Sequence, residues 1–350
     1  MSSASLEMPP FQKPPFAGFF PKHGVPEIIR QAQKIDLSGQ VAIISGANSG
    51  LGFHAAKHLL GLKLSHLILA VRSKEKGKEA AANLQKQFSS ARIDVWDLDM
   101  LSYESIQAFV RRIEKHLDRL DIIILNSGIA HSTFTICPGT GHCEDIQVNY
   151  LSTFLLAILV LQTLKKMKTT RSPTLSTPRM TIVNSGTALA AKFPNRNERR
   201  LLASFDDSQV QPFDTLERYS VSKLLGHLFF VRLLKCLDPE DAIVNLIQPG
   251  LCKGTRLFRE APLVMTVIFS VVKFFTALTV EEGAWLYVDA VVLRGKESHG
   301  CFVSEGKIQP FASLASSEEG SKTVDALWGE TMTEFEFAGI REMLQSEVQS

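Results

Sequence analysis

Tyr219 and Lys223 are the two side chains of this sequence whose types and spacing most clearly allow chemistry. They stand four residues apart in an apolar run, 218–234, that has helical spacing, so both are expected on one helical face, one turn apart. A phenol ordinarily titrates near ~10. A fixed ammonium nearby lowers that pKa because it stabilises the phenolate, and the pair could then exchange protons near neutral pH. The alternative is that Tyr219 and Lys223 form an ordinary surface pair. Other motifs in the sequence are needed to choose between a catalytic pair and a surface pair.

A glycine-rich turn near the start of the chain is typical of nucleotide binding. The apolar run 40–45 predicts a buried parallel strand, and the segment from Phe53 onward predicts a helix. Glycines between a strand and a helix let the backbone approach a pyrophosphate, and the helix N-terminus offers free N–H groups. The residues predicted to hold the nucleotide here are Gly46, Asn48, Ser49, Gly50, Leu51 and Gly52.

The end of the next predicted strand, 66–71, indicates which nucleotide is bound. In NAD-binding units an acidic residue about 20 positions after the glycines contacts the ribose 2′-hydroxyl. Arg72 occupies that position, counted from Gly52, and no acidic residue is adjacent to it. A guanidinium can form two hydrogen bonds with a 2′-phosphate, and Lys74 or Lys76 could add positive charge, so NADP is predicted over NAD. A solvated basic turn is the alternative.

Further polar motifs follow the later predicted strands or lie in a predicted helix. In chain order they are Asp99, Asn126 with Gly128, Asn149, Ser185, Pro249 with Gly250, and Thr255. Together with the glycine turn and the Tyr-x-x-x-Lys pair, they make the chain resemble a short-chain dehydrogenase/reductase over residues 37 to 308, with Ser127 replacing the usual alanine of an N-A-G motif. The resemblance implies an α/β, doubly wound Rossmann fold with a seven-stranded parallel sheet in a single domain that carries N- and C-terminal extensions.

The resemblance also assigns roles. Tyr219 would exchange a proton with the substrate oxygen, and Ser185 would hydrogen-bond that oxygen. Tyr219 and Lys223 would also contact the cofactor, with Lys223 holding the nicotinamide ribose. Asn149 would hold a water that relays protons. Asp99 and Asn126 would contact the adenine end of NADP(H). Pro249 and Gly250 would close over the nicotinamide end. Thr255, after a spacing that Gly254 lengthens, would contact the carboxamide or the diphosphate.

Composition favours a globular enzyme. Hydrophobic residues make up 45% and charged residues 21% of 350 residues, enough for one large α/β domain. A formal charge of +2 gives no reason to expect nucleic acid. The five cysteines show no metal-ligand spacing and suggest a reducing compartment, so no metal is predicted.

The sequence divides into three predicted parts. Residues 1–36 are a Pro/Phe-rich extension without the apolar core of a signal peptide, residues 37–315 the catalytic domain, and residues 316–350 a helical tail. Inside the domain, the long segment 188–218 is expected to shape the substrate site. The apolar segment 255–280 is interpreted as a lid over an apolar substrate, ahead of a membrane-surface contact or a true span.

These patterns predict an NADP(H)-dependent reductase or dehydrogenase acting on the carbonyl or alcohol of a small apolar substrate. Similarity to fungal reductases implies a ketoreductase step of secondary-metabolite biosynthesis. A retinol- or sterol-type enzyme at a membrane and a non-catalytic nucleotide sensor are the alternatives. The protein is expected to be cytoplasmic. The sequence leaves the oligomeric state open, with a homodimer as one option, since the helix that starts at Tyr219 is often an interface in relatives.

Overall fold

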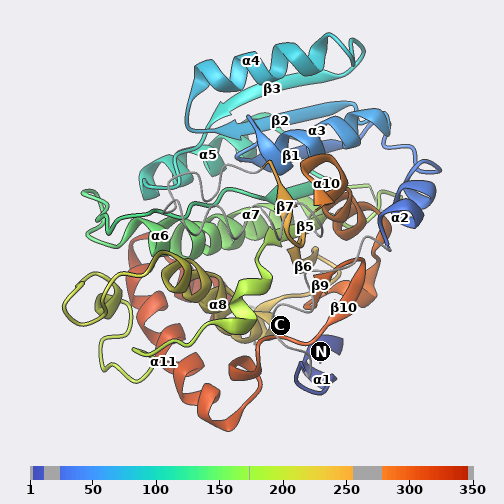
Figure 1. The fold of residues 1–350 in the computed structure, drawn as a ribbon. Helices are drawn as coiled ribbons and strands as arrows, with labels where there is room; N and C mark the ends of the chain where they lie inside the picture. The colour runs from blue at the N-terminus through green and yellow to red at the C-terminus, as the bar shows by residue number, and fades with distance from the viewer. Residues whose placement is uncertain (1–2, 12–23, 173, 255–277, 346–350) are drawn as a thin grey trace.

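A computed structural model describes residues 3–11, 24–172, 174–254 and 278–345 of the chain (Figure 1). The predicted lid segment therefore lies almost entirely outside the described residues, and so does Thr255.

The central sheet has the strand order β10-β9-β6-β5-β4-β1-β2-β3. Every neighbouring pair from β3 to β9 is parallel, and β10 adds an antiparallel edge strand. The predicted seven-stranded parallel sheet is confirmed, and the short turn at Glu305 and Gly306 appends the eighth strand. The strands are β1 Val41–Ser45, β2 His66–Val71, β3 Arg92–Asp97, β4 Ile122–Leu125, β5 Arg179–Val183, β6 Ile243–Gln248, β9 Phe302–Ser304 and β10 Lys307–Gln309; β7 Cys252–Lys253 and β8 Leu278–Thr279 form a separate small sheet.

Helices cover both faces of the sheet because its central strands are apolar on both sides. One core cluster joins the sheet to α5, α7, α8 and α11, and the other joins it to α2, α3, α4 and α10. The helices are α1 Ala4–Glu7, α2 Val25–Ala32, α3 Gly50–Gly61, α4 Lys74–Gln85, α5 Tyr103–His116, α6 Glu144–Ile146, α7 Thr153–Lys168, α8 Thr215–Leu233, α10 Val280–Val288, α11 Glu318–Glu334 and α12 Ile340–Gln345.

The strand order 3-2-1-4-5-6 places a topological switch point between β1 and β4. Ligands of doubly wound sheets bind at this point, outside the carboxyl ends of the strands. Ser45 and Asn126 end or follow those two strands and are hydrogen-bonded to each other, because the Asn126 backbone N–H donates to Ser45 Oγ over 2.9 Å. The fold thus brings two separately predicted motifs to one edge.

Both ends of the chain pack on this domain. Ser5 Oγ accepts a hydrogen bond from the Phe302 backbone at 2.9 Å, which attaches α1 to β9. Figure 1 shows α11 lying along α8, where Trp328 stacks on Phe229 with ring centroids 5.1 Å apart. The sequence-based boundaries at residues 36 and 315 remain predictions.

Among the described residues, one helical stretch, Glu144–Lys168, is long and apolar enough to cross a membrane. Its apolar window is 89% buried inside the fold. It packs as a core helix against the sheet, α5 and α8.

Candidate active site

Helix α8 presents Tyr219 and Lys223 toward the sheet. It begins at Asp214, whose side chain accepts a hydrogen bond from the Glu217 backbone over 2.7 Å and so caps the helix. Tyr219 and Lys223 are both only 5% exposed, so the alternative of an ordinary surface pair is excluded. The Lys223 ammonium donates to the Val183 carbonyl at 2.9 Å and lies 5.9 Å from the centre of the Tyr219 ring.

Ser185 follows β5 and meets Tyr219. Its side chain shares a hydrogen bond with the phenol and accepts another from the Thr187 hydroxyl at 3.0 Å. The preceding residue, Asn184, accepts from the Ser185 backbone at 2.7 Å and donates to the Lys223 carbonyl at 3.0 Å. Through these two hydrogen bonds, Asn184 connects the end of β5 with α8. Nothing in the sequence indicated this role.

Asn149 lies in a π-helical turn, Gln147–Ser152, within the long core helix. Its amide exchanges hydrogen bonds with the Ile129 backbone N–H at 2.9 Å and carbonyl at 2.8 Å, and it also donates to Ser222 Oγ at 3.0 Å. Ser222 in turn donates to the Tyr219 carbonyl at 2.7 Å. The structure thus places Asn149 beside the turn of α8 that carries Tyr219 and Lys223, with its amide bonded to the Ile129 backbone and to Ser222.

The pKa values differ from the sequence-based expectation. Burial raises the pKa of Tyr219 to about 12, although the hydrogen bond from Ser185 lowers it. Burial also lowers the pKa of Lys223 to about 8. The pKa of the phenol is therefore raised and not lowered as the neighbouring ammonium led us to expect, because desolvation of the phenolate is the largest influence on it.

The glycine turn has the backbone that a pyrophosphate site needs. Gly46 and Gly50 take left-handed φ values of 66° and 59°, which favour glycine. Ser49 is the N-cap of α3 but makes no side-chain capping hydrogen bond, whereas Ser73 caps α4 and Ser102 caps α5. The first N–H groups of α3 therefore lack a capping partner and remain available to an anion, as predicted for Gly50, Leu51 and Gly52.

Asn126 fixes this turn from β4. Its amide group donates to the Ser45 carbonyl at 2.9 Å and to the Gly46 carbonyl at 3.3 Å. The buried Tyr287 of α10 donates its hydroxyl to Asn126 Oδ1 at 3.2 Å, which sets the orientation of that amide. Sequence reasoning missed Tyr287, since nothing in its apolar helix marks it.

Gly128 lies beside Asn149 and Lys223, two of the predicted catalytic residues. A Cβ added at this position would lie 3.3 Å from Asn149 Oδ1 and 3.5 Å from Lys223 Nζ. The missing side chain leaves room beside both groups, as a cofactor passing between the glycine turn and Lys223 would need.

Three further predicted cofactor residues follow the carboxyl ends of β2 and β3: Arg72, Lys76 and Asp99. Arg72 and Lys76 are exposed after β2, and no other described residue forms an ion pair with either side chain. Lys74 is instead paired with Asp97. Asp99 accepts a hydrogen bond from the Leu101 backbone at 3.0 Å and so shapes the turn into α5. Among the described residues, Arg72 therefore has no ion-pair partner that would compete with a bound phosphate.

After β6, Pro249 is buried and Gly250 takes a left-handed φ of 71°. Pro249 lies beside the small β7–β8 sheet, where its carbonyl accepts from the Cys252 thiol at 3.5 Å. Within the described parts of the chain, no group of three His, Cys, Asp or Glu residues could hold a metal ion.

The segment between Ser185 and α8 is held by the C-terminal helix. Glu330 of α11 accepts hydrogen bonds from the Leu201 and Leu202 backbones at 2.7 and 2.8 Å. His142 bonds Asp206 of the segment at 2.8 Å and lies 3.3 Å from Glu334 of α11. The tail thus helps to position the segment that the sequence predicts to shape the substrate site.

We expect His142 to make folding stability pH-dependent. Burial opposes its charge, but Asp206 and Glu334 outweigh burial and raise the pKa of His142 to about 9. A group whose pKa is raised on folding stabilises the protein fully below its unfolded value near ~6.5. The stabilisation, on the order of 2–3 kcal/mol, should disappear as pH rises from about 6.5 through 9. Urea unfolding at pH 6 and pH 9.5 measures it.

The substitution His142→Asn is the control for this effect. It removes the titrating group, so the difference in unfolding free energy between the two pH values should shrink by about 2 kcal/mol. An unchanged pH dependence in the variant would show that other groups cause it.

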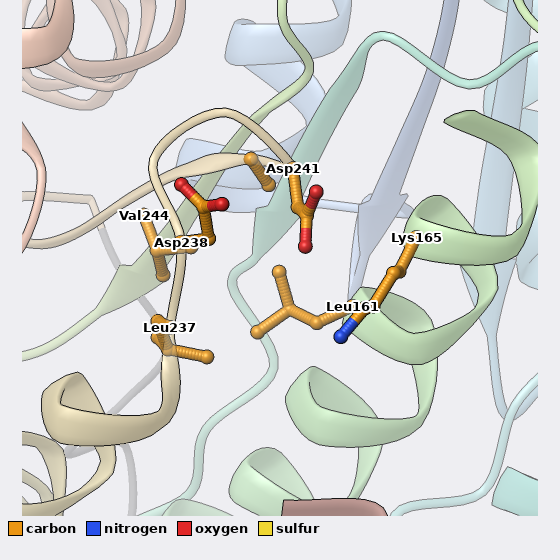
Figure 2. Close-up of a pocket in the computed structure, with 7 residues that line it drawn as sticks. Leu161, Lys165, Leu237, Asp238, Asp241 and Val244 are labelled. Atoms are coloured by element: carbon orange, nitrogen blue, oxygen red, sulfur yellow. The ribbon is translucent and has the colours of Figure 1, made fainter. Parts of the chain in front are cut away.

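A hollow at the opposite edge of the sheet does not belong to the site. Figure 2 shows Asp238, Asp241 and Lys165 around it, beyond the amino end of β6. Its volume of about 10 Å³ is barely enough for one water molecule. It is too small for an organic substrate.

Fold and site together define a Rossmann-type oxidoreductase. The profile of the short chain dehydrogenase family matches residues 40–172. The short chain dehydrogenase/reductase mfmJ of Annulohypoxylon moriforme is 45% identical over 98% of both chains, and the short chain dehydrogenase virL of Hypocrea virens is 42% identical over 87% of both. The chain belongs to the short-chain dehydrogenase/reductase family.

Solved structures agree on the fold. Salutaridine reductase from Papaver somniferum superimposes with a TM-score of 0.57 at 19% identity, covering 75% of this chain and 99% of its own. L-sorbose reductase from Gluconobacter frateurii, complexed with NADPH and L-sorbose, gives a TM-score of 0.55 at 21% identity, covering 77% and 97%. At these identities the likeness supports the Rossmann fold alone.

Proposed function

We propose that the protein transfers a hydride between NADP(H) and the carbonyl or alcohol of a small apolar substrate. The observation that carries the proposal is the grouping of Ser185, Tyr219 and Lys223 beside Gly128, at the sheet edge that also holds the uncapped end of α3. A nucleotide sensor would need the glycine turn but no buried phenol hydrogen-bonded to a serine.

The residues present fit a dinucleotide. The N–H groups of Gly50, Leu51 and Gly52 would bind the diphosphate, and Lys223 would hold the ribose next to the nicotinamide. Asp99 and Asn126 would lie toward the adenine end, and Pro249 and Gly250 toward the nicotinamide. When bound, the cofactor supplies or accepts the hydride.

The chain's own residues would handle the proton and the substrate oxygen. Tyr219 keeps its phenol proton until the carbonyl oxygen gains electron density, and then donates it. Ser185, already hydrogen-bonded to the phenol, would hold that oxygen in place. Lys223 and Asn149 would return a proton to Tyr219 through a bound water. In alcohol oxidation the same groups act in reverse.

Arg72 should determine the preference for NADPH. In Arg72→Ala we expect the Kd for NADPH to rise ~10- to 100-fold and that for NADH to stay within about threefold, because only NADPH carries the 2′-phosphate. Fluorescence titration of both nucleotides measures the two Kd values. Lys74→Ala is the control, since Lys74 is already paired with Asp97. Equal affinity of the wild type for NADH and NADPH would contradict the cofactor proposal.

The substrate is proposed to be an apolar ketone or aldehyde, as in a ketoreductase step of fungal secondary-metabolite biosynthesis. Support comes from relatives in fungi and from two aromatic side chains with ring centroids 6.1 Å apart: Phe134, in the loop between β4 and α6, and Phe213, just before α8. NADPH oxidation across a panel of apolar and polyol carbonyl compounds tests this. Turnover of polyols alone would overturn it.

A cytoplasmic location and a homodimer are also proposed. The described part of α8 is largely buried and is packed against α11, so a dimer through α8 would have to form around the tail helix. Light scattering of the purified protein gives the oligomeric state. Retention in membranes after a high-salt wash would contradict the cytoplasmic proposal.

A further inference from the structure

Thr187 is hydrogen-bonded to the side chain of Ser185 through two separate groups. Its hydroxyl donates to Ser185 Oγ at 3.0 Å, and its backbone N–H donates to the same oxygen at 3.3 Å. Thr187 belongs to none of the predicted motifs. Because Ser185 is proposed to hold the substrate oxygen, two contacts with its side-chain oxygen bear directly on the chemistry of the site.

The fold holds the turn that carries Thr187 from two sides. This turn is a short 3₁₀ helix, Gly186–Ala190, that directly follows Ser185 and packs against α8. On the side of β6, a Cβ added to Gly186 would collide with the Gln248 side chain. Gln248 is buried and its amide donates to a serine of β9, so it has little freedom to move away. The backbone around Thr187 is therefore fixed next to Ser185.

The two hydrogen bonds use the acceptor capacity of Ser185. A serine hydroxyl has one hydrogen to donate and two lone pairs that accept. With Thr187 bonded at both lone pairs, the hydroxyl can form one further hydrogen bond, and in that bond it is the donor. The hydrogen bond with Ser185 lowers the pKa of Tyr219, as donation to the phenol oxygen would, since it stabilises the phenolate.

The direction of this hydrogen bond matters for the proposed reaction. A carbonyl oxygen that gains electron density is stabilised by groups that donate to it. If Ser185 could accept from the phenol, the Tyr219 proton would be shared with the serine. A serine that can only donate leaves the phenol proton for the substrate oxygen, and both hydroxyls then donate to that one acceptor.

We propose that Thr187 is a positioning residue that fixes Ser185 as a hydrogen-bond donor to the substrate oxygen. The inference rests on the proposed function, in which Ser185 and Tyr219 act on that oxygen. Thr187 exchanges no proton. In carbonyl reduction the O–H bond that breaks belongs to Tyr219, the one that forms is on the substrate oxygen, and Ser185 keeps its hydrogen.

Thr187→Val removes the hydroxyl and keeps both the side-chain shape and the backbone N–H. We expect kcat for carbonyl reduction to fall about 3- to 10-fold, the effect of one hydrogen bond. Thr187→Ser retains a hydroxyl and should stay within about twofold of the wild type. Thr163→Val is the matched control, because the buried Thr163 hydroxyl bonds the Leu159 carbonyl of its own helix at 3.0 Å. Its turnover should stay within about twofold of the wild type.

A double-mutant cycle shows whether Thr187 acts through Ser185. Ser185→Ala alone should lower kcat about 10²-fold, as expected for the loss of one donor to the reacting oxygen. Adding Thr187→Val should then change kcat by less than about twofold, because the oxygen that Thr187 bonds is already gone. The Kd for NADPH, measured by fluorescence titration, should stay within about twofold in every variant of the cycle, since the glycine turn is untouched.

Four results would overturn the inference: wild-type turnover in Thr187→Val, wild-type turnover in Ser185→Ala, a Thr187→Ser variant as slow as Thr187→Val, or an undiminished loss when Thr187→Val is added to Ser185→Ala. The last result would mean that Thr187 acts independently of Ser185. Full activity of Tyr219→Phe would instead count against the proposed function itself.

Discussion

Tyr219→Phe is expected to lower kcat for carbonyl reduction by about 10²- to 10⁴-fold, the usual contribution of a positioned general acid. The change removes one oxygen from a side chain that is 5% exposed and leaves the ring in place. The Kd for NADPH should stay within about threefold, because the contacts proposed for the glycine turn, Arg72 and Lys223 remain when the phenol oxygen is lost. Steady-state kinetics with the best substrate of the panel, together with a nucleotide titration, separates the two effects.

Tyr150→Phe is the matched control for this prediction. Tyr150 is also buried, but its hydroxyl bonds Thr331 of α11 at 2.6 Å instead of a catalytic group. It should lose about 1 kcal/mol of stability and retain turnover within a few-fold. A Tyr219→Phe variant with full activity would show that another group supplies the proton.

Gly52→Ala is expected to raise the Kd for NADPH about 100-fold and to destabilise the protein by about 1–3 kcal/mol. A Cβ at this position would lie 2.6 Å from Asn126 Nδ2 and 3.0 Å from the Gly46 carbonyl. Asn126 cannot move away without breaking its bonds to Ser45 and Tyr287. The turn would have to shift, and with it the N–H groups proposed to bind the diphosphate. Calorimetric titration and thermal unfolding measure the two effects.

Gly61→Ala lies at the other end of the same helix, where an added Cβ meets nothing within 4 Å. It should leave nucleotide affinity unchanged and stabilise α3 by about 0.5–1 kcal/mol, because alanine favours a helix over glycine. If both glycine variants bound NADPH like the wild type, the diphosphate would lie elsewhere.

Local patterns predicted the fold and most of the site. Apolar runs such as 66–71 and 243–248 became β2 and β6, because buried parallel strands need apolar side chains on both faces. The fingerprint at Gly46–Gly52 was readable because a phosphate-binding turn depends on backbone conformations that glycine favours. The four-residue spacing of Tyr219 and Lys223 was enough to place both on one helical face.

Contacts between residues far apart in the chain could not be predicted from the sequence. The hydroxyl of Tyr287 reaches Asn126 across 161 positions, and His142 meets Glu334 from the other end of the chain. No local sequence pattern identifies such residues, because their partners come close only when the strands and helices assemble into the folded domain.

Tyr219 shows most clearly which properties the sequence determines and which depend on the tertiary structure. By itself the sequence determined that this phenol and the Lys223 ammonium share a helical face, because helix periodicity depends on local spacing alone. Only the tertiary structure decided that the phenol has a pKa of about 12 instead of a lowered one. The reason is that burial depends on elements that meet only after the chain has folded.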